Sequence, residues 1–183
     1  CMDNPNKNAL VVRSRYGSGK TSFLQRLVRR RNPERVLFIT YRQTLARDIM
    51  RNFGKLNFKK YLDAHDDPSV WNAPRLIVQL DSLMNIFMKS DDVLSGEGFK
   101  LKYDMIILDE SESLLNHFDE QTMSDKEIGI WNFFDELLKH CDNMLLMDGD
   151  ISDRSLSFAS AYGEITYINN KNTGAPRTIN LMR

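Results

Sequence analysis

The chain contains few of the residues that characterise disulfide-rich, metal-binding or membrane-spanning proteins. Only two of its 183 residues are cysteines, and neither Cys1 nor Cys141 has another metal-ligating side chain at a useful spacing. We therefore expect free thiols, no cysteine-based metal centre, and a reducing compartment inside the cell. The three histidines, His65, His117 and His140, are scattered, and we expect surface or helix-cap positions for them. No apolar run approaches the roughly 20 residues that cross a bilayer, so we expect no membrane segment.

Glycine and proline are also scarce, with 9 and 5 residues, whereas 42% of the chain is hydrophobic. This composition excludes a disordered chain and indicates one globular domain with a real core. The net charge is zero, but residues 1–60 hold 15 basic and 3 acidic side chains, against 10 and 22 in the remainder. A basic amino-terminal third is suited to bind a polyanion, although a run such as Arg29 to Arg31 also fits a solvated helix surface.

Apolar segments of strand length alternate with amphipathic segments of helix length along the whole chain. The predicted strands span residues 8–13, 36–39, 58–62, 76–80, 103–108, 143–147 and 165–168. The predicted helices span residues 22–31, 42–53, 83–88, 112–118, 125–140 and 153–161, and residues 90–102 are predicted to be a loop. This alternation predicts the α/β class, with a mostly parallel sheet and helices on both faces. Ligands bind such sheets beyond the carboxyl ends of the strands, where we expect Thr21, Thr40, Gln79, Asp109 and Asp148.

A glycine-containing loop joins the first predicted strand to the first predicted helix. Its two close glycines let the backbone turn several N–H groups toward one point, and the helix start adds further N–H groups and its positive dipole end. Lys20 is placed to reach the outer phosphates of a nucleotide, and the Thr21 hydroxyl is placed to ligate Mg²⁺. We therefore predict ATP and Mg²⁺ as cofactors, bound through Ser14, Tyr16, Gly17, Ser18, Gly19, Lys20, Thr21 and Ser22.

This loop departs at one position from the general pattern G-x-x-x-x-G-K-[ST]. Ser14 stands where the pattern has its first glycine, and the remaining positions agree. The order of strand, loop and helix also matches. The alternative interpretation is a flexible strand-to-helix turn that carries an unrelated lysine.

Two carboxylates, Asp109 and Glu110, directly follow the apolar strand predicted over residues 103–108. Asp109 is placed to hold Mg²⁺ through water, opposite Thr21, and Glu110 is placed to polarise the water that attacks the γ-phosphate. A lysine, a metal and a carboxylate are the parts that such positioning and charge neutralisation require, so we assign catalytic roles to Lys20, Asp109 and Glu110. The alternative is a strand followed by an ordinary helix cap.

Five short segments together resemble a known family. They are Gly17-Ser18-Gly19-Lys20-Thr21, Thr40-Tyr41-Arg42-Gln43-Thr44-Leu45-Ala46, Val78-Gln79-Leu80-Asp81-Ser82-Leu83, Asp109-Glu110-Ser111-Glu112 and Met147-Asp148-Gly149-Asp150. In this order and spacing the chain resembles the first RecA-like domain of superfamily-2 DNA helicases. More narrowly, it is similar to the replication-origin-binding-protein helicases of herpesviruses and other large DNA viruses. The resemblance implies a P-loop ATP-binding helicase domain over residues 1–170, and a linker over 171–183 toward a second RecA-like domain.

The resemblance also implies roles for individual residues. Thr40, Arg42, Thr44, Gln79 and Ser82 would contact the backbone of a nucleic acid, and Asp148 and Asp150 would couple ATP hydrolysis to movement. Three departures stand out. The coupling motif usually reads Ser/Thr-Ala-Thr, no adenine-reading glutamine motif precedes the loop, and the later motifs with the arginine of the γ-phosphate site are missing. Because such an arginine is worth about 10³–10⁵ in rate, we expect slow hydrolysis by this fragment.

The resulting expectation is a motor domain that uses ATP to move along DNA during viral replication. Its partners would be single-stranded or forked DNA, the second RecA-like domain and other replication proteins, in the nucleus or at a viral replication site. Two alternatives stay open, namely a P-loop ATPase of a packaging or remodelling machine, and an adaptor with a vestigial nucleotide site. Salt-dependent binding of single-stranded DNA would separate the first of these from a helicase.

Overall fold

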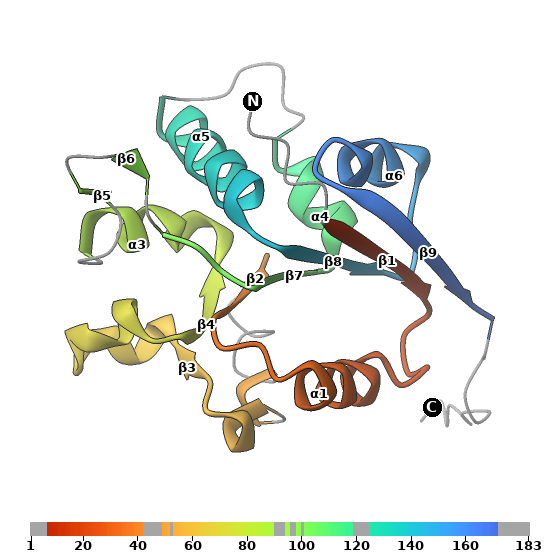
Figure 1. Ribbon diagram of the computed structural model, residues 1–183, viewed down its shortest axis with the longest axis horizontal. Helices are drawn as coiled ribbons and strands as arrows, with labels where there is room; N and C mark the ends of the chain where they lie inside the picture. Colours follow the sequence, from red (N-terminus) through yellow and green to blue (C-terminus); the bar gives the residue numbers. More distant parts are fainter. Residues whose placement is uncertain are drawn as a thin grey trace, which may run out of the picture.

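A seven-stranded parallel sheet forms the centre of the protein (Figure 1). The computed structural model describes residues 7–41, 49–51, 53–89, 94–95, 98–99, 101–118 and 125–171. The strand order is β3-β4-β2-β7-β8-β1-β9, and every neighbouring pair is parallel. The strands are β1 (Asn8–Ser14), β2 (Val36–Thr40), β3 (Lys59–Lys60), β4 (Arg75–Gln79), β7 (Met105–Asp109), β8 (Asn143–Asp148) and β9 (Glu164–Asn170). The predicted α/β class with a parallel sheet is confirmed.

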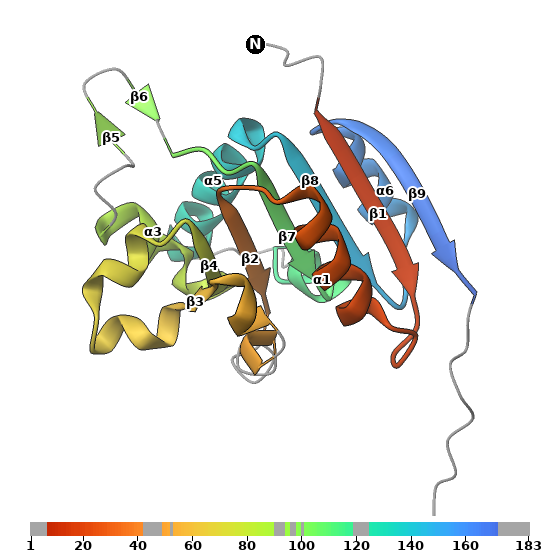
Figure 2. The ribbon, with the colours of Figure 1, turned by 60° about the horizontal axis from the view of Figure 1, so that its bottom comes forward.

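Helices cover both faces of this sheet, as Figures 1 and 2 show. Helix α1 (Lys20–Arg31) lies on one face, and α4 (Ser111–Asn116), α5 (Asp125–His140) and α6 (Asp153–Ser160) lie on the other. Helix α3 (Leu83–Lys89) packs against α5. The connections include 3₁₀ helices at η1 (Gly54–Leu56), η2 (Tyr61–His65), η3 (Pro68–Asn72) and η4 (Leu80–Ser82).

The central strands are buried along their length because helices cover both sides of them. All five residues of β2 and the first four of β7 are buried, which explains their continuous rather than alternating apolar sequence. Aromatic rings fill the space between α4, α5 and α6. Phe134 stacks between Phe118 and Phe158, with ring centroids 5.8 and 6.2 Å away, and Trp131 lies 4.9 Å from Phe118. This aromatic packing holds α4, α5 and α6 against one another.

Several predicted boundaries are confirmed and others need correction. Helix α5 has the predicted bounds, whereas α1 begins at Lys20 rather than at residue 22. The predicted loop over residues 90–102 contains an antiparallel hairpin of β5 (Leu94–Ser95) and β6 (Gly98–Phe99), strands too short to show a period of two. Strand β9 (Glu164–Asn170) extends beyond both ends of the strand predicted over residues 165–168.

Two further segments differ from prediction in part. The strand predicted over residues 58–62 has only two paired residues, and Tyr61 already begins the 3₁₀ helix η2. Of the helix predicted over residues 42–53, residues 42–48 and 52 lie outside the described residues, and residues 49–51 and 53 are helical. Ile49 and Phe53 are buried there, as the predicted amphipathic pattern requires.

Two glycines give a matched test of the packing. A Cβ atom on Gly163 would lie 2.8 Å from the backbone oxygen of Lys7, which also accepts the hydrogen bond of Glu164 that begins the β1–β9 pairing. We expect Gly163→Ala to lower the free energy of unfolding by about 1–3 kcal/mol, because rigid backbone has to move. In α5, a Cβ atom added to Gly129 would meet no described atom within 4 Å, so Gly129→Ala should instead raise stability by about 0.5–1 kcal/mol. Urea unfolding followed by circular dichroism measures both, and equal signs would contradict this packing.

A candidate nucleotide site at the carboxyl ends of the central strands

The loop after β1 has the backbone geometry of an anion-binding loop. Gly17 and Gly19 have φ angles of 77° and 92°, in the left-handed region that favours glycine. Helix α1 begins directly after Gly19, and its first regular hydrogen bond runs from Phe23 N–H to the Gly19 oxygen at 2.9 Å. Within the described chain, no side chain caps this helix end and its first turn holds no acidic residue. The first N–H groups of α1 are therefore available to an anion.

The predicted phosphate-binding residues surround this helix start, although not all of them face inward. Thr21 and Ser22 are exposed at the first turn, Lys20 is half-buried, and Tyr16 is 86% exposed at the loop. A cavity of about 340 Å³ lies between the loop and the end of β9. Its walls comprise Val12, Ser14, Ser18, Gly19, Lys20, Phe23, Ile168, Asn169, Asn170 and Lys171.

Asp109 lies two strands away from the loop, at the same edge of the sheet. Strand β8 separates β7 from β1, and its pairing sets Asp109 beside Met147 and Asp148 beside Arg13. Burial raises the pKa of Asp109 to about 6, while the positive charge of Lys20 acts in the opposite direction. The neighbouring negative charges of Glu110 and Asp148 contribute to this rise. The lysine of the loop and the acid of the central strand are thus within electrostatic reach of each other.

Glu110 adopts an uncommon backbone conformation. Its φ and ψ angles of 54° and 49° lie in the left-handed region, where a non-glycine residue costs about 1–2 kcal/mol. Its N–H donates a hydrogen bond to the Asp109 carboxylate at 3.2 Å, and helix α4 begins at the next residue. Strain of this kind is kept where the surrounding structure fixes a functional side chain, which agrees with the catalytic role predicted for Glu110.

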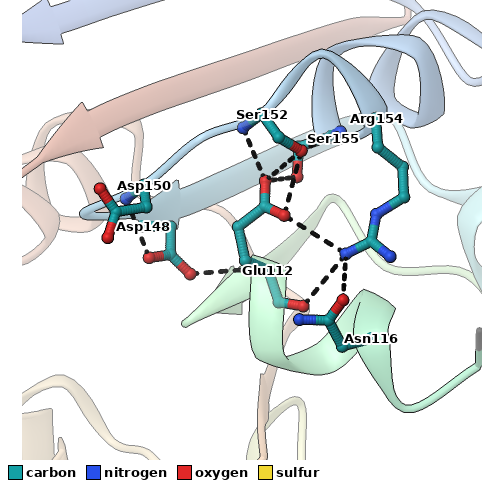
Figure 3. Close-up of polar contacts among 7 residues, drawn as sticks. All are labelled: Glu112, Asn116, Asp148, Asp150, Ser152, Arg154 and Ser155. Carbon is teal, nitrogen blue, oxygen red and sulfur yellow. Dashed lines mark hydrogen bonds and ion pairs between the residues drawn. The ribbon is translucent and has the colours of Figure 1, made fainter.

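Glu112 links α4 to the start of α6 through several hydrogen bonds (Figure 3). Its carboxylate accepts from the N–H of Ser152 at 2.7 Å, from the Ser152 hydroxyl at 2.9 Å, and from the Ser155 hydroxyl. Arg154 lies 3.3 Å from the other carboxylate oxygen and also donates to Asn116 at 2.8 Å. Burial alone would raise the pKa of Glu112, but the donors from Ser155 and Ser152 together with Arg154 lower it. The Glu112 carboxylate is therefore ionised, and both of its oxygen atoms accept hydrogen bonds.

Asp148 and Asp150, which the sequence analysis grouped together, have different surroundings. The Asp148 carboxylate accepts from the backbone N–H of Glu112 at 3.0 Å and from that of Asp150 at 3.2 Å. It therefore holds the first turn of α4 against the end of β8. The Asp150 side chain is 94% exposed, and its carboxylate forms a loose ion pair with Arg13 at 3.8 Å.

The local sequence does not indicate the contacts among Glu112, Ser152, Ser155 and Arg154. Glu112 was part of a quoted motif, but nothing near it in the chain indicates its partners, because they follow a different strand. The spacing Ser152-x-x-Ser155 is the helix-cap signature found here, since the Ser152 hydroxyl accepts from Ser155 N–H at 3.4 Å. Nothing in the local sequence indicates that the same two serine hydroxyls also donate to Glu112.

The residues predicted to contact nucleic acid are only partly available to do so. Thr40 is completely buried, which argues against the direct phosphate contact predicted for its hydroxyl. The amide of Gln79 accepts from the Tyr61 hydroxyl at 2.9 Å and donates to the backbone oxygen of Tyr41 at 3.2 Å. Ser82 is half-buried at the end of η4. Arg42 and Thr44 lie outside the described residues.

His117 is the C-cap residue of α4, one of the positions expected for the histidines, and its side chain makes further contacts. Its side chain is 22% exposed, and its Nε2 atom lies 3.3 Å from a carboxylate oxygen of Asp81. Its ring also meets the ring of Tyr41 edge-on, with centroids 5.9 Å apart. Because His117 directly follows α4, it joins that helix to the two segments that the sequence analysis connected with nucleic acid.

The residues at this edge of the sheet fit a nucleotide-bound Mg²⁺ better than a metal held by protein alone. The described residues contain no group of three or more His, Cys, Asp or Glu side chains arranged around a common point. Thr21 and Asp109 supply oxygen atoms, which Mg²⁺ prefers, and Mg²⁺ at phosphate sites is held by one or two such groups plus the phosphates. Asp109 is half-buried and its raised pKa shows that its negative charge is disfavoured there, so a bound cation would stabilise it.

The raised pKa of Asp109 predicts that its charge destabilises the ligand-free protein near neutral pH. A pKa of about 6 in the folded protein lies above the ordinary value of 3.8, so folding binds the proton more tightly. The penalty is complete above pH 6 and disappears as the pH falls toward about 4, and for this pKa difference it amounts to roughly 3 kcal/mol. We expect Asp109→Asn to raise the free energy of unfolding at pH 7.5 by about 1–3 kcal/mol, with no gain at pH 4.

Chemical denaturation across this pH range measures the effect. Asp150→Asn is the matched control, because its side chain is 94% exposed and should show no such pH dependence. Parallel pH curves for the wild type and Asp109→Asn would contradict the assignment.

Comparison with known proteins agrees with this geometry. The sequence pattern of the family described as "Origin of replication binding protein" matches residues 1–166. The chain is 32% identical over 174 residues to a protein of Acanthamoeba polyphaga mimivirus named "Putative replication origin-binding protein", covering 92% of this chain and 21% of that protein. It is 29% identical over 172 residues to the replication origin-binding protein of human herpesvirus 6A, covering 91% of this chain and 20% of that protein. The chain thus spans about a fifth of the length of these relatives.

Solved structures show the same fold. An ATP-dependent RNA helicase from Sulfolobus tokodaii, described as hypothetical, superposes with a TM-score of 0.63 at 18% identity, over 90% of this chain and 48% of that one. A DEAD box protein from Methanococcus jannaschii superposes with a TM-score of 0.58 at 20% identity, over 89% of this chain and 45% of that one. Among the helices of the described residues, none is both long and apolar enough to cross a membrane. The chain has the fold of a RecA-like helicase domain and belongs to the origin of replication binding protein family.

Proposed function

We propose that this chain is the ATP-binding motor domain of a DNA helicase or translocase that acts in viral DNA replication. The observation that carries the proposal is the meeting of the glycine loop, the free start of α1 and the acid pair of β7 at one edge of the sheet. The influence of Lys20 on the pKa of Asp109 supports their proximity. The names of the relatives support replication as the setting.

Different residues at this edge of the sheet would bind the phosphates, hold Mg²⁺ and orient the attacking water. Loop N–H groups and Lys20 would bind the β- and γ-phosphates, while Thr21 and Asp109 would hold Mg²⁺. The metal, when bound, neutralises charge on the phosphates. Glu110, fixed by its left-handed backbone, would orient a water molecule toward the γ-phosphate and accept its proton. Positioning and charge are the main contributions that such a site makes to the reaction.

Helix α4 is the element best suited to transmit the state of the nucleotide. Its first turn follows Glu110 and is held by Asp148, and its Glu112 side chain is bound to the start of α6. Its other end reaches Asp81 through His117. A small shift at the γ-phosphate would therefore reach both the loop after β8 and the segment Gln79–Ser82.

Nucleic acid is the partner that this arrangement fits best. Two solved structures with the same fold are described as bound to it, namely Mss116 with single-stranded RNA and a SWI2/SNF2 ATPase core with double-stranded DNA. In this chain, the half-buried Ser82 lies at the carboxyl edge of the sheet, beyond the end of β4. We propose DNA rather than RNA because the relatives are origin-binding proteins.

One observation favours the second candidate, an ATPase that moves no nucleic acid by itself. Thr40 is fully buried and the Gln79 amide is engaged by Tyr61 and Tyr41, so two of the predicted contacts are occupied within the protein. A packaging or remodelling ATPase would need the nucleotide site without these contacts. The two candidates differ in whether the chain binds single-stranded DNA.

The nucleotide site is tested by removing its lysine. Lys20→Ala should weaken binding of Mg²⁺-ADP by roughly 10- to 100-fold, because hydrogen bonds to charged groups contribute about 1.5–3 kcal/mol each. Titration of a fluorescent ADP analogue measures the change. Lys55→Ala is the control. Because Lys55 is exposed on η1, this variant should bind Mg²⁺-ADP as the wild type does. Equal affinity of Lys20→Ala and wild type would refute the nucleotide site.

Binding of single-stranded DNA separates the two candidates. For three or four phosphate contacts, affinity for a labelled 20-nucleotide strand should fall roughly 20- to 50-fold between 50 and 200 mM salt. Fluorescence anisotropy gives both affinities, and an uncharged peptide nucleic acid of the same sequence serves as the control ligand. Absence of binding at 50 mM salt would favour the packaging or remodelling ATPase.

A further inference from the structure

Ser14, the one residue that departs from the phosphate-loop pattern, is buried and hydrogen-bonded on two sides. Only 2% of its surface is exposed. Its Oγ atom lies 2.5 Å from the Oγ atom of Ser18 and accepts a hydrogen bond from Nδ2 of Asn170 at 3.0 Å. The pairing of β1 with β9 explains the second contact, because it sets Ser14 directly beside Asn170.

The direction of these hydrogen bonds follows from the number of protons. The Ser18 hydroxyl donates its proton to the backbone oxygen of Arg15, because a carbonyl oxygen is only an acceptor. The proton between the two serines must then belong to Ser14. Asn170 donates through its amide nitrogen. The four groups form one chain, from the Asn170 amide through Ser14 and Ser18 to the Arg15 carbonyl.

This series of hydrogen bonds begins at the end of β9 and ends inside the phosphate-binding loop. Arg15 and Ser18 bracket the turn at Gly17, so the hydrogen bonds fix the spacing of the backbone whose N–H groups face an anion. The same cavity wall contains Ser14, Ser18 and Asn170. With glycine at position 14, as the pattern has it, neither Asn170 nor Ser18 would have this hydroxyl as a partner.

A simpler explanation is that Asn170 only satisfies a buried serine. Buried hydroxyl groups are hydrogen-bonded as a rule, and one partner is enough for that purpose. Ser18 already supplies that partner to Ser14. The contact with Asn170 is an addition, and it connects the loop to a strand that comes more than 150 residues later.

We propose that Asn170 is a positioning residue for the phosphate-binding loop and acts on it through Ser14 and Ser18. For its ligand, the phosphate of a nucleotide, this inference rests on the proposed function. Asn170 is the last residue of β9, and the chain continues from it at Lys171. The loop is therefore sensitive to any displacement of the backbone at that point.

Amide hydrogen exchange of the ligand-free protein tests the connection without any nucleotide. Asn170→Ala and Ser14→Ala should each speed exchange of the amides at residues 15–19 by roughly three- to tenfold, the change expected for one neutral hydrogen bond. The double variant should exchange no faster than Ser14→Ala, because both substitutions break the same chain. Thr166→Ala is the control, since Thr166 is exposed on β9 and should leave the loop unchanged.

A titration with Mg²⁺-ADP then tests the consequence for binding. Asn170→Ala should weaken affinity by roughly three- to tenfold, with unchanged circular dichroism as evidence of folding. Unchanged loop exchange in Asn170→Ala overturns the inference even where the wild type binds nucleotide. Faster exchange with unchanged affinity also overturns it, because Asn170 would then be merely structural. If Lys20→Ala binds as the wild type does, the proposed function fails, and the exchange result alone decides whether Asn170 holds the loop.

Discussion

The attraction between Lys20 and Asp109 across strand β8 is the interaction on which the candidate site depends. Asp109 is half-buried at the end of the central strand, next to two other carboxylates, and the charge of Lys20 opposes the resulting rise in its pKa. A parallel sheet brings these groups together because all its strands end at one edge. Without that alignment, a loop after β1 and an acid after β7 would be unrelated features of the chain.

Helix α4 shows how the fold extends this local arrangement. Six residues long, it is too short to be stable alone and is held by side chains from other elements. Asp148 binds its start, Glu112 fastens it to α6, and His117 contacts Asp81 just beyond its end. The helix that follows the acid pair is thus positioned by three contacts, and it connects the candidate nucleotide site with the segment after β4.

The sequence predicted the sheet and its helices, and it indicated the two parts of the candidate nucleotide site, because apolar periodicity and the glycine loop are local signals. It did not predict the burial of Thr40, since a threonine at a strand end has the same sequence signature inside or outside the protein. The partners of Glu112 were also missed, because they come from α6 and meet it only after folding. The β5–β6 hairpin has two residues per strand, too few for any pattern to register. The predicted contacts of Gln79 and Ser82 with DNA stay predictions.

The ordered protons between Asn170 and Arg15 have an electronic consequence. Each hydroxyl in the series accepts from the group before it and donates to the group after it, so each donor polarises the next one. The series ends on a carbonyl oxygen that shares its peptide group with the N–H of Tyr16. Drawing electron density toward that oxygen makes the attached N–H more acidic, and a more acidic N–H is a stronger donor to an oxyanion. In the proposed phosphate-binding loop, an amide side chain at the end of β9 would thereby tune the affinity of a backbone group that it never touches.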